Sequence, residues 1–373
     1  MKEHEIVIIG GGLAGLTVAI HLAQEGMDVA VMEANTYPHH KVCGEYVSKE
    51  IAPYLGRLGI DLQNVGAVDI KRLQLSAVKG DLLQTNLDLG GYGISRYTLD
   101  NLLYKRAKAL GVHFYFEKVV QCNFRENTFI ITTNTRAYTS KLAIGAYGKR
   151  SLLDKSLKRN FSLMKHGWLA VKGHYAWNDF PSDVVGLHNF EGGYGGLSTT
   201  ELGHINFCYL VHYNSFKRYK DVQEFNNQVV AQNKYLKQFL EEATPIFEQP
   251  MTIAQISFSK KEVVVDHMLM CGDTAGLIHP LCGNGMAMAV HSAKIVAELI
   301  VAYKNDSAYD RTQLEQEYIK AWSANFGKRI WMGRKLQSIL MHDKWVSLGI
   351  RTIGKSPRVL NYIISKTHGK LVH

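Results

Sequence analysis

"EIVIIGGGLAGLTVAIHLAQEGMDVAVME", residues 5–33, joins a β-branched run, a glycine-rich turn, an apolar helical pattern and a second β-branched run. Glu5–Ile9 predicts a buried strand, because the run is apolar and stops at glycine. Leu16–Gly26 predicts a helix, and Asp28–Glu33 predicts a second strand that ends in an acid. This order of elements predicts a Rossmann-like unit in an α/β fold.

The turn carries the GxGxxG spacing at Gly10, Gly12 and Gly15. Gly10 allows the tight turn, Gly12 lets the backbone approach a pyrophosphate, and Gly15 lets the helix pack on the strand. The helix N-terminus would face the phosphates, and Glu33 would accept a hydrogen bond from a ribose hydroxyl. A glycine-rich turn alone is common, so the prediction of dinucleotide binding depends on the whole unit. FAD and NAD both remain open at this point.

A second glycine-rich stretch, "GDTAGLIHPLCGNGM", runs from Gly272 to Met286 between an apolar run and a helical pattern. NAD folds of this type need no such junction near the C-terminus. Flavoproteins that extend FAD across the domain do need one, because the ribityl chain and the ring reach beyond the first loop. This stretch therefore favours FAD.

The chain resembles the FAD-dependent oxidoreductases of the p-hydroxybenzoate hydroxylase fold, and among them the geranylgeranyl reductase-like branch. Four stretches carry the resemblance: "GGGLAG", "KVCGE" (Lys41–Glu45), "SRYTLDNLLYKRAKALGV" (Ser95–Val112) and "CGDTAGLIHPLCGNG" (Cys271–Gly285). The resemblance implies an α/β (overall α+β) architecture, with a Rossmann-like FAD-binding domain and an inserted antiparallel-sheet substrate domain. It also implies FAD as the cofactor, with NAD(P)H as a candidate electron donor. No motif for covalent attachment is visible, so we expect non-covalent FAD.

The resemblance implies that Asp273 binds the ribityl chain, that Arg96 reaches the cofactor and that the backbone near Val120 holds the adenine. A helix cap for Asp273 and a surface ion pair for Arg96 are the plain structural alternatives. The predicted cofactor-binding residues are Gly10, Gly12, Ala14, Gly15, Glu33, Lys41, Arg96, Val120, Asp273, Gly283, Asn284, Gly285 and Met286. No histidine spacing typical of a metal site is present, so no metal is predicted.

Cys43, in "KVCGE", is the candidate proton donor, with Tyr46 as a second candidate and a small packing residue as the plain alternative for Cys43. Tyr194, in "EGGYGGLS", is a candidate substrate contact or an ordinary strand aromatic. The chain departs from the family at "IGAYGKRS", where Tyr147 stands in place of an Asp. This departure puts the family's way of handling NAD(P)H in doubt, and leaves the flavin prediction intact.

We expect a discontinuous FAD-binding domain at residues 1–70, 95–160 and 260–305, and a substrate-binding sheet domain at 71–94 and 161–259. Residues 306–373 should form a basic helical segment. Helical patterns run from Asp221 to Glu242 and from Asp310 to Met341.

The formal net charge of +10 is concentrated at the C-terminal end of the chain. Ten Lys and Arg residues follow Phe326, with Asp343 as the one acid among them. This segment predicts either a helix packed on the body or a surface for an anionic membrane or an acidic acyl carrier protein. Five irregularly spaced cysteines indicate a reducing compartment, so we expect a cytoplasmic protein, peripheral at a membrane in the second case, with no nucleic-acid partner.

Two enzymatic functions and one non-enzymatic function fit the sequence. The first is reduction of a carbon–carbon double bond in a hydrophobic molecule of the isoprenoid, lipid or polyketide class. The second is flavin-dependent monooxygenation of an aromatic or lipid-like substrate. Halogenation is disfavoured, because the tryptophan-rich stretch of that branch is absent. The third is a flavin-bearing scaffold without turnover.

Overall fold

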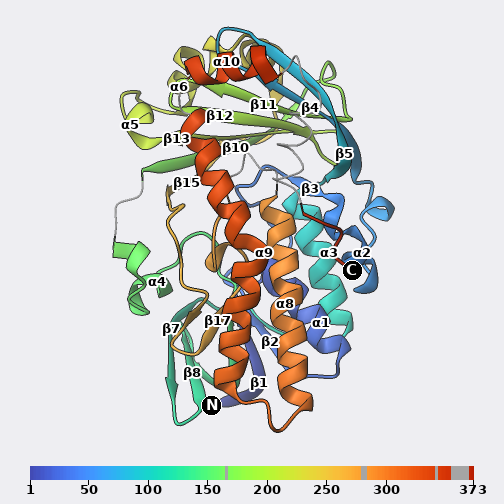
Figure 1. Ribbon diagram of the computed structural model, residues 1–373, viewed down its shortest axis with the longest axis vertical. Helices are drawn as coiled ribbons and strands as arrows, with labels where there is room; N and C mark the ends of the chain where they lie inside the picture. Colours follow the sequence, from blue (N-terminus) through green and yellow to red (C-terminus); the bar gives the residue numbers. More distant parts are fainter. Residues whose placement is uncertain (164–166, 279–283, 341–342, 354–368) are drawn as a thin grey trace.

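The computed structural model describes residues 1–163, 167–278, 284–340, 343–353 and 369–373. Two sheets stack along the long axis of the molecule, with the second sheet at the top of Figure 1 and the first sheet at the bottom. The chain is an α/β protein, as the sequence predicts. It passes from one sheet to the other several times, so each sheet contains strands from separate parts of the sequence.

The first sheet has the order β16-β17-β9-β1-β2-β6, and the strands from β17 to β6 are parallel. Its strands are β1 (Lys2–Ile9), β2 (Val29–Met32), β6 (His113–Tyr115), β7 (Val119–Arg125), β8 (Thr128–Thr133), β9 (Ala137–Gly145), β16 (Val264–Val265) and β17 (Met268–Met270). The helix after β1 begins at Leu13, directly after Gly12, and is longer at its start than the sequence pattern predicts.

The second sheet has the order β14-β10-β13-β12-β11-β4-β5-β3, and β15 pairs with β10. Its strands are β3 (Tyr46–Ser48), β4 (Val68–Ser76), β5 (Leu82–Gly93), β10 (Trp168–Ala176), β11 (Val184–Phe190), β12 (Gly193–Thr199), β13 (Ile205–His212), β14 (Thr244–Pro245) and β15 (Met251–Ile256). The sheet is antiparallel except where β11 pairs with β4 in parallel. The limits of the two domains stay a prediction. One strand of this sheet, β3, comes from the range 1–70, which the sequence analysis assigns to the FAD-binding domain.

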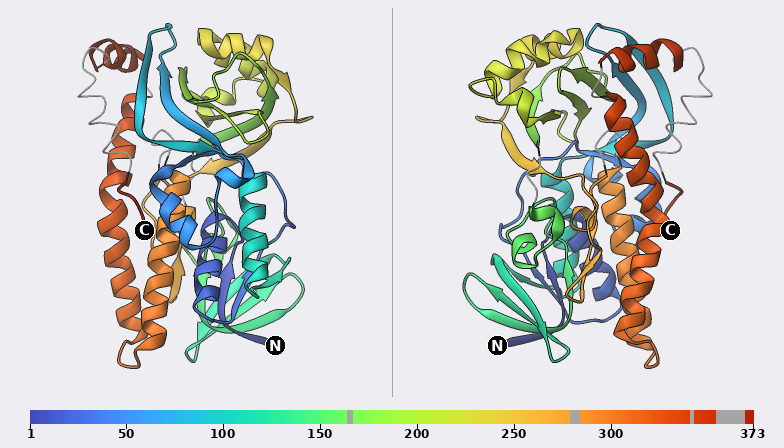
Figure 2. Two further views of the ribbon diagram at one scale, coloured as in Figure 1. Left: turned by 90° about the vertical axis from the view of Figure 1, so that its right-hand side faces the viewer. Right: turned by 60° about the vertical axis from the view of Figure 1, so that its left-hand side comes forward.

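Ten helices are found in the described ranges. They are α1 (Leu13–Gln24), α2 (Ala52–Arg57), α3 (Arg96–Ala109), α4 (Leu153–Ser156), α5 (Tyr213–Phe216), α6 (Val222–Gln228), α7 (Lys234–Glu242), α8 (Gly285–Asn305), α9 (Arg311–Leu340) and α10 (Asp343–Ile353). Helix α8 packs between α1 and α9, and Figure 2 shows α8 and α9 side by side in both views. The predicted helix Asp221–Glu242 is two helices, because Asn233 ends one turn and caps α7.

Two apolar cores stabilise the two halves. The larger core surrounds the first sheet with α1, α3, α8 and the first half of α9. The smaller core lies between one face of the second sheet and α6 and α7, where Phe207, Phe225 and Phe239 are buried. The other face of the second sheet is therefore left to contact the first half.

Within the described part of the predicted C-terminal segment, α9 and α10 are helical, and α10 packs on the second sheet. Val346 and Ile350 of α10 are buried against Ala77, Leu75 and Leu83. Among the described helices, only α8 has the length and apolar composition that could span a membrane, and 61% of its apolar window is buried inside the protein. Such burial is that of a core helix.

Candidate cofactor and active site

The glycine-rich stretches meet at the carboxyl edge of the first sheet. Gly10 follows β1, Gly145 ends β9 and Cys271 follows β17, and these are neighbouring parallel strands. The Ala146 amide donates to the Ile9 carbonyl at 2.8 Å, and the Cys271 amide donates to the Gly145 carbonyl at 2.9 Å. Ligands of open α/β sheets bind at such an edge.

Each glycine of the first loop has a different neighbour. A side chain at Gly10 would lie 2.4 Å from the Ala146 carbonyl, in a backbone with φ of +106°, and one at Gly15 would lie 2.0 Å from the Gly10 carbonyl. The nearest atoms to a side chain at Gly12 are instead the Arg96 Nη2 at 3.6 Å and the Lys41 Nζ at 3.7 Å. Gly10 and Gly15 are thus required by the fold, and Gly12 faces two cations.

A buried carboxylate holds these two cations in place. Asp100 is 1% exposed, accepts two 2.7 Å hydrogen bonds from Arg96 and lies 3.2 Å from the Lys41 Nζ. Burial would raise the pKa of Asp100, but Arg96 and then Lys41 outweigh it and keep that pKa below its usual value. Arg96 is 13% exposed and pairs with a buried acid, so its ion pair is largely buried, and its contact with the cofactor stays a prediction.

Glu33 lies at the end of β2, as its predicted role requires. Its carboxylate accepts from the Gly11 amide at 2.9 Å and from the Asn35 amide at 3.2 Å. The Tyr37 hydroxyl, which the sequence did not single out, donates to the Gly11 carbonyl at 2.5 Å, and its ring stacks on Tyr104. This aromatic pair covers the first loop beside Glu33.

The second junction lies against the first loop. Gly272 has a φ of +61°, and a side chain there would lie 2.8 Å from the Ala14 Cβ. Among the described residues the Asp273 carboxylate makes no hydrogen bond, whereas its backbone carbonyl accepts from Lys261 at 2.8 Å. Burial lowers the pKa of Lys261 to about 8. The Asp273 carboxylate thus has hydrogen-bonding capacity left beside the first loop, with the Lys261 ammonium as a nearby charge.

The N-terminus of α8 completes this junction. Asn284 is buried, Gly285 begins α8 and Met286 is buried. The Asn284 side chain donates to the buried Glu50 at 3.3 Å. Gly283 lies outside the described residues, so its predicted contact stays a prediction.

These features fit FAD. The Gly12 backbone beside Arg96 and Lys41 suits a pyrophosphate, because two cations and a helix N-terminus face it. The Glu33 and Asp273 carboxylates are acceptors that ribose and ribityl hydroxyls could use. Val120 is exposed on β7, and no described contact links it to the first loop. The individual cofactor contacts stay predictions.

We expect Asp273→Ala to lose most of its bound FAD while the protein stays folded. Unpaired ribityl hydroxyls would cost roughly 1–3 kcal/mol, or about tenfold to hundredfold in FAD affinity. The FAD-to-protein absorbance ratio after gel filtration measures this loss. The exposed residue Asp179 supplies the control variant Asp179→Ala, and an Asp273→Ala protein with full FAD content would contradict the assignment.

The loop Lys41–Glu45 meets the free face of the second sheet. The Glu45 carboxylate is buried, and it accepts from the Lys172 Nζ at 2.5 Å, from the His174 Nε2 at 2.6 Å and from the Arg96 amide at 2.8 Å. Ligand atoms of His40, Glu45 and His174 lie within 4.8 Å of one another. The Lys172 ammonium on the same carboxylate opposes a further cation, so a metal remains unsupported here.

The two candidate proton donors lie in different surroundings. Cys43 is half-buried, and its thiol lies near enough to the Arg96 guanidinium to influence the pKa of Arg96. The Tyr46 ring packs against Ile70 and Leu87 in the second sheet, and its burial raises the pKa of the hydroxyl. The geometry therefore favours Cys43 over Tyr46.

Tyr194 belongs to an apolar cluster between the sheet and the cofactor junctions. Ala170, Leu210 and Leu277 are buried with it, and Val42 packs against them. Because Val42 neighbours Cys43 and Leu277 follows Asp273 by four residues, this cluster adjoins both loops. Tyr147 stands at the position where the family has an Asp. Its hydroxyl donates a hydrogen bond to Asp154 and accepts one from Arg159.

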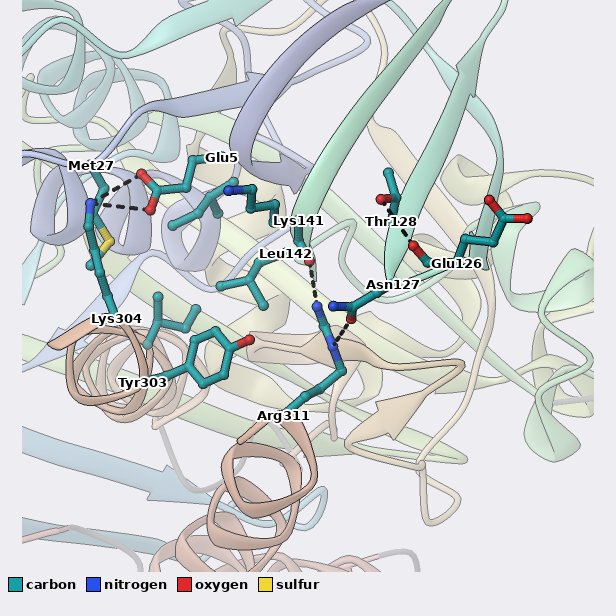
Figure 3. Close-up of a pocket in the computed structure, with 12 residues that line it drawn as sticks. Glu5, Met27, Glu126, Asn127, Thr128, Lys141, Leu142, Tyr303, Lys304 and Arg311 are labelled. Carbon is teal, nitrogen blue, oxygen red and sulfur yellow. Dashed lines mark hydrogen bonds and ion pairs between the residues drawn. The ribbon is translucent and has the colours of Figure 1, made fainter. Parts of the chain in front are cut away.

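The cavity in Figure 3 is not part of this site. It measures about 290 Å³ and is closed on two sides by the Glu5–Lys304 ion pair and by Arg311, which donates to Asn127 and to the Lys141 carbonyl. Glu5 lies five residues before Gly10 on β1, which is roughly 16 Å along a strand. The cavity is thus far from the glycine-rich loops.

Comparisons with known proteins agree with this geometry. The model of the FAD binding domain family matches residues 3–316. The menaquinone reductase of Mycobacterium tuberculosis is 21% identical over 365 residues, covering 92% of this chain and 85% of that protein. The kynurenine 3-monooxygenase of Cytophaga hutchinsonii is 25% identical over 343 residues, covering 80% and 73%.

Solved structures share the fold. The flavin-dependent brominase Bmp2 superposes with a TM-score of 0.80 at 15% identity, covering 98% of this chain and 93% of that chain. A geranylgeranyl bacteriochlorophyll reductase-like protein from Thermoplasma acidophilum gives 0.79 at 18% identity, covering 98% and 96%. A brominase and a reductase-like protein thus share this architecture.

Proposed function

The chain belongs to the FAD binding domain family and is an FAD-dependent oxidoreductase, and we propose that it reduces a carbon–carbon double bond in a hydrophobic small molecule. The observation that supports this proposal is the apolar cluster around Tyr194 next to the half-buried Cys43 thiol. An isoprenoid, lipid or polyketide-like chain suits a lining of apolar side chains of this kind.

The residues have separate roles in this proposal. Gly12, Lys41 and Arg96 would hold the pyrophosphate, Glu33 the ribose and Asp273 the ribityl chain. FAD held by these residues, and reduced by a donor of the NAD(P)H class, would supply the hydride for one carbon of the double bond. The Cys43 thiol gives a proton to the other carbon, and water returns a proton to the thiolate. The apolar cluster keeps water from the double bond.

Product mass distinguishes this reaction from the alternative. The enzyme is reduced chemically without oxygen and incubated with extracts of hydrophobic metabolites, and the products are analysed by mass spectrometry. A gain of two hydrogens under these conditions supports the reductase. Turnover only with oxygen, and a gain of one labelled oxygen atom from labelled dioxygen, would favour a monooxygenase, to which the likeness to kynurenine 3-monooxygenase points. Absence of any product would favour a scaffold.

We predict that the FAD is bound without a covalent link. No attachment motif is visible in the sequence, and the predicted contacts are hydrogen bonds and ion pairs. Acid precipitation should release the yellow colour into the supernatant. Flavin that stays in the denatured pellet would show a covalent bond.

The basic segment also supports a proposal about partners. Arg329 pairs with the buried Glu50, and Arg351 pairs with Asp81, so both serve the fold. Trp331, in contrast, is 57% exposed on α9, and the Lys335 ammonium lies 5.8 Å from its ring centre. An exposed Trp among cations suits the interface of an anionic membrane.

We expect the protein to sediment with anionic vesicles at low salt and to be released at high salt. Each cation near such a surface contributes on the order of 1 kcal/mol, and salt screens it. Trp331→Ala should weaken sedimentation, and neutral vesicles are the control. Retention by an acidic acyl carrier protein and not by vesicles would point to a carrier instead, and retention by neither would leave the segment a structural one.

A further inference from the structure

The loop Lys41–Glu45 is bound to the protein through its backbone in an unusual way. Four consecutive carbonyl groups each accept a hydrogen bond from a side chain far away in the sequence. The Lys172 Nζ donates to Lys41 at 3.0 Å, the Lys149 Nζ to Val42 at 3.1 Å, the Asn206 Nδ2 to Cys43 at 3.2 Å and the Ser198 Oγ to Gly44 at 3.1 Å. Surface loops usually leave such carbonyl groups to water.

Three of these donors come from one face of the second sheet. These three donors are Lys172 on β10, Asn206 on β13 and Ser198 on β12. Asn206 pairs with Ser198 on one side and with His174 on the other, and Lys172 lies two residues before His174 on the same face. Lys172 and Asn206 are fully buried, and Ser198 is 1% exposed. The loop residues Lys41–Gly44 are themselves half-buried or exposed. Buried polar groups of the sheet thus fix an outer loop.

Glu45 ends the loop in a conformation that needs support. Its φ is +53°, a left-handed backbone that few residues other than glycine adopt. Its carboxylate binds Lys172 and His174, so the sheet holds this residue as well. Such backbone geometry persists where surrounding contacts determine it, and it is frequent at functional sites.

We propose that Lys172, Ser198 and Asn206 form a positioning row that fixes the Cys43 thiol beside Arg96. The row makes the substrate-binding sheet and the proton-donating loop one rigid unit, so that a substrate seated on the sheet meets the thiol at a set distance. This inference rests on the role of Cys43 proposed above. None of the three residues touches the double bond; each acts through the loop backbone.

The test measures the loop without requiring turnover. Wild type, Asn206→Ala and Lys172→Met, all loaded with FAD, are treated with iodoacetamide, and the alkylation rate of the Cys43 peptide is followed by mass spectrometry. The visible circular dichroism of the bound FAD is recorded in parallel. Both variants should alkylate Cys43 at least about tenfold faster, because a loosened loop opens locally, and both should change the dichroism.

Asn233→Ala is the matched control. Asn233 is also a fully buried Asn of the second half, and its side chain donates to the Ala77 and Asn189 carbonyl groups, away from the loop. It should lower thermal stability and leave Cys43 alkylation and the dichroism unchanged. Unchanged alkylation in both row variants, or the same change in Asn233→Ala, would overturn the proposal.

A further variant separates this proposal from the proposed function. If Cys43→Ala keeps full turnover while Asn206→Ala still alters alkylation, the row positions the loop but the thiol is not the proton donor. That result would overturn the link to catalysis. Loss of turnover in Cys43→Ala and in both row variants supports the whole proposal.

Discussion

Gly12→Val should fold normally and bind almost no FAD. Its nearest side-chain neighbours would be the flexible ends of Arg96 and Lys41 at 3.6 and 3.7 Å, and its φ of −83° suits any residue. The fold therefore admits a Cβ at this position, and the nearest atoms are the ends of flexible side chains. The pyrophosphate does not admit one, because it must approach the backbone at this position. We expect at least a hundredfold loss of FAD affinity, or roughly 2.7 kcal/mol.

The measurement is the FAD-to-protein ratio together with the melting temperature of the apoprotein. Gly56→Val is the control, since nothing lies within 4 Å of a side chain at the exposed Gly56. It should keep FAD. Gly15→Val should instead fail to fold, because its side chain would overlap the Gly10 carbonyl. Full FAD content in Gly12→Val would refute the assignment of the first loop.

The part of the site that lies in one short stretch could be predicted from the sequence. The turn at Gly10–Gly15 and the acid Glu33 belong to one local unit, so their spacing alone gave their positions. Asp273 was identified through family resemblance, and the structure adds that its carboxylate makes no hydrogen bond among the described residues. Local chemistry of this kind survives in any fold that forms the unit.

Contacts between distant segments could not be predicted in the same way. The stretch "GWLAVKGHYAW" predicts a strand, and Lys172 and His174, two residues apart, share one face of it. The structure shows that the loop around Cys43 covers that face, and no periodicity reveals which loop covers a sheet. The role of Asp100 as a buried partner of Arg96 could not be predicted for a similar reason, because an Asp four residues after an Arg on a helix also suits a surface ion pair.

The topology of the second sheet shows the same limit. Its strands were expected to be antiparallel neighbours, yet β11 lies parallel to β4, which is more than a hundred residues earlier. The pattern of a strand specifies which of its sides is apolar, but which other strand pairs with its edge depends on the packing of the whole chain. The membership of β3 in this sheet was hidden for the same reason.

Glu45→Gln should lower the free energy of unfolding by about 3–5 kcal/mol, because it leaves a buried charge without its partner. The Lys172 ammonium is 0% exposed and lies 2.5 Å from the Glu45 carboxylate. Glutamine has nearly the same shape, so lost packing contributes little. Urea denaturation followed by circular dichroism at neutral pH measures the difference from wild type.

The double variant Glu45→Gln/Lys172→Met tests the cause. Methionine follows the shape of the lysine stem without its charge, so the double variant should recover most of the stability that Glu45→Gln loses. Burial would raise the pKa of Glu45, but His174 and Lys172 outweigh it and hold that pKa below its ordinary value. The contribution of Glu45 is therefore full above its unfolded pKa and is lost as the pH falls through its folded pKa. Wild type and Glu45→Gln should thus converge in stability in acid, and a constant difference at every pH would show that the lost hydrogen-bond geometry, and not the charge, is responsible.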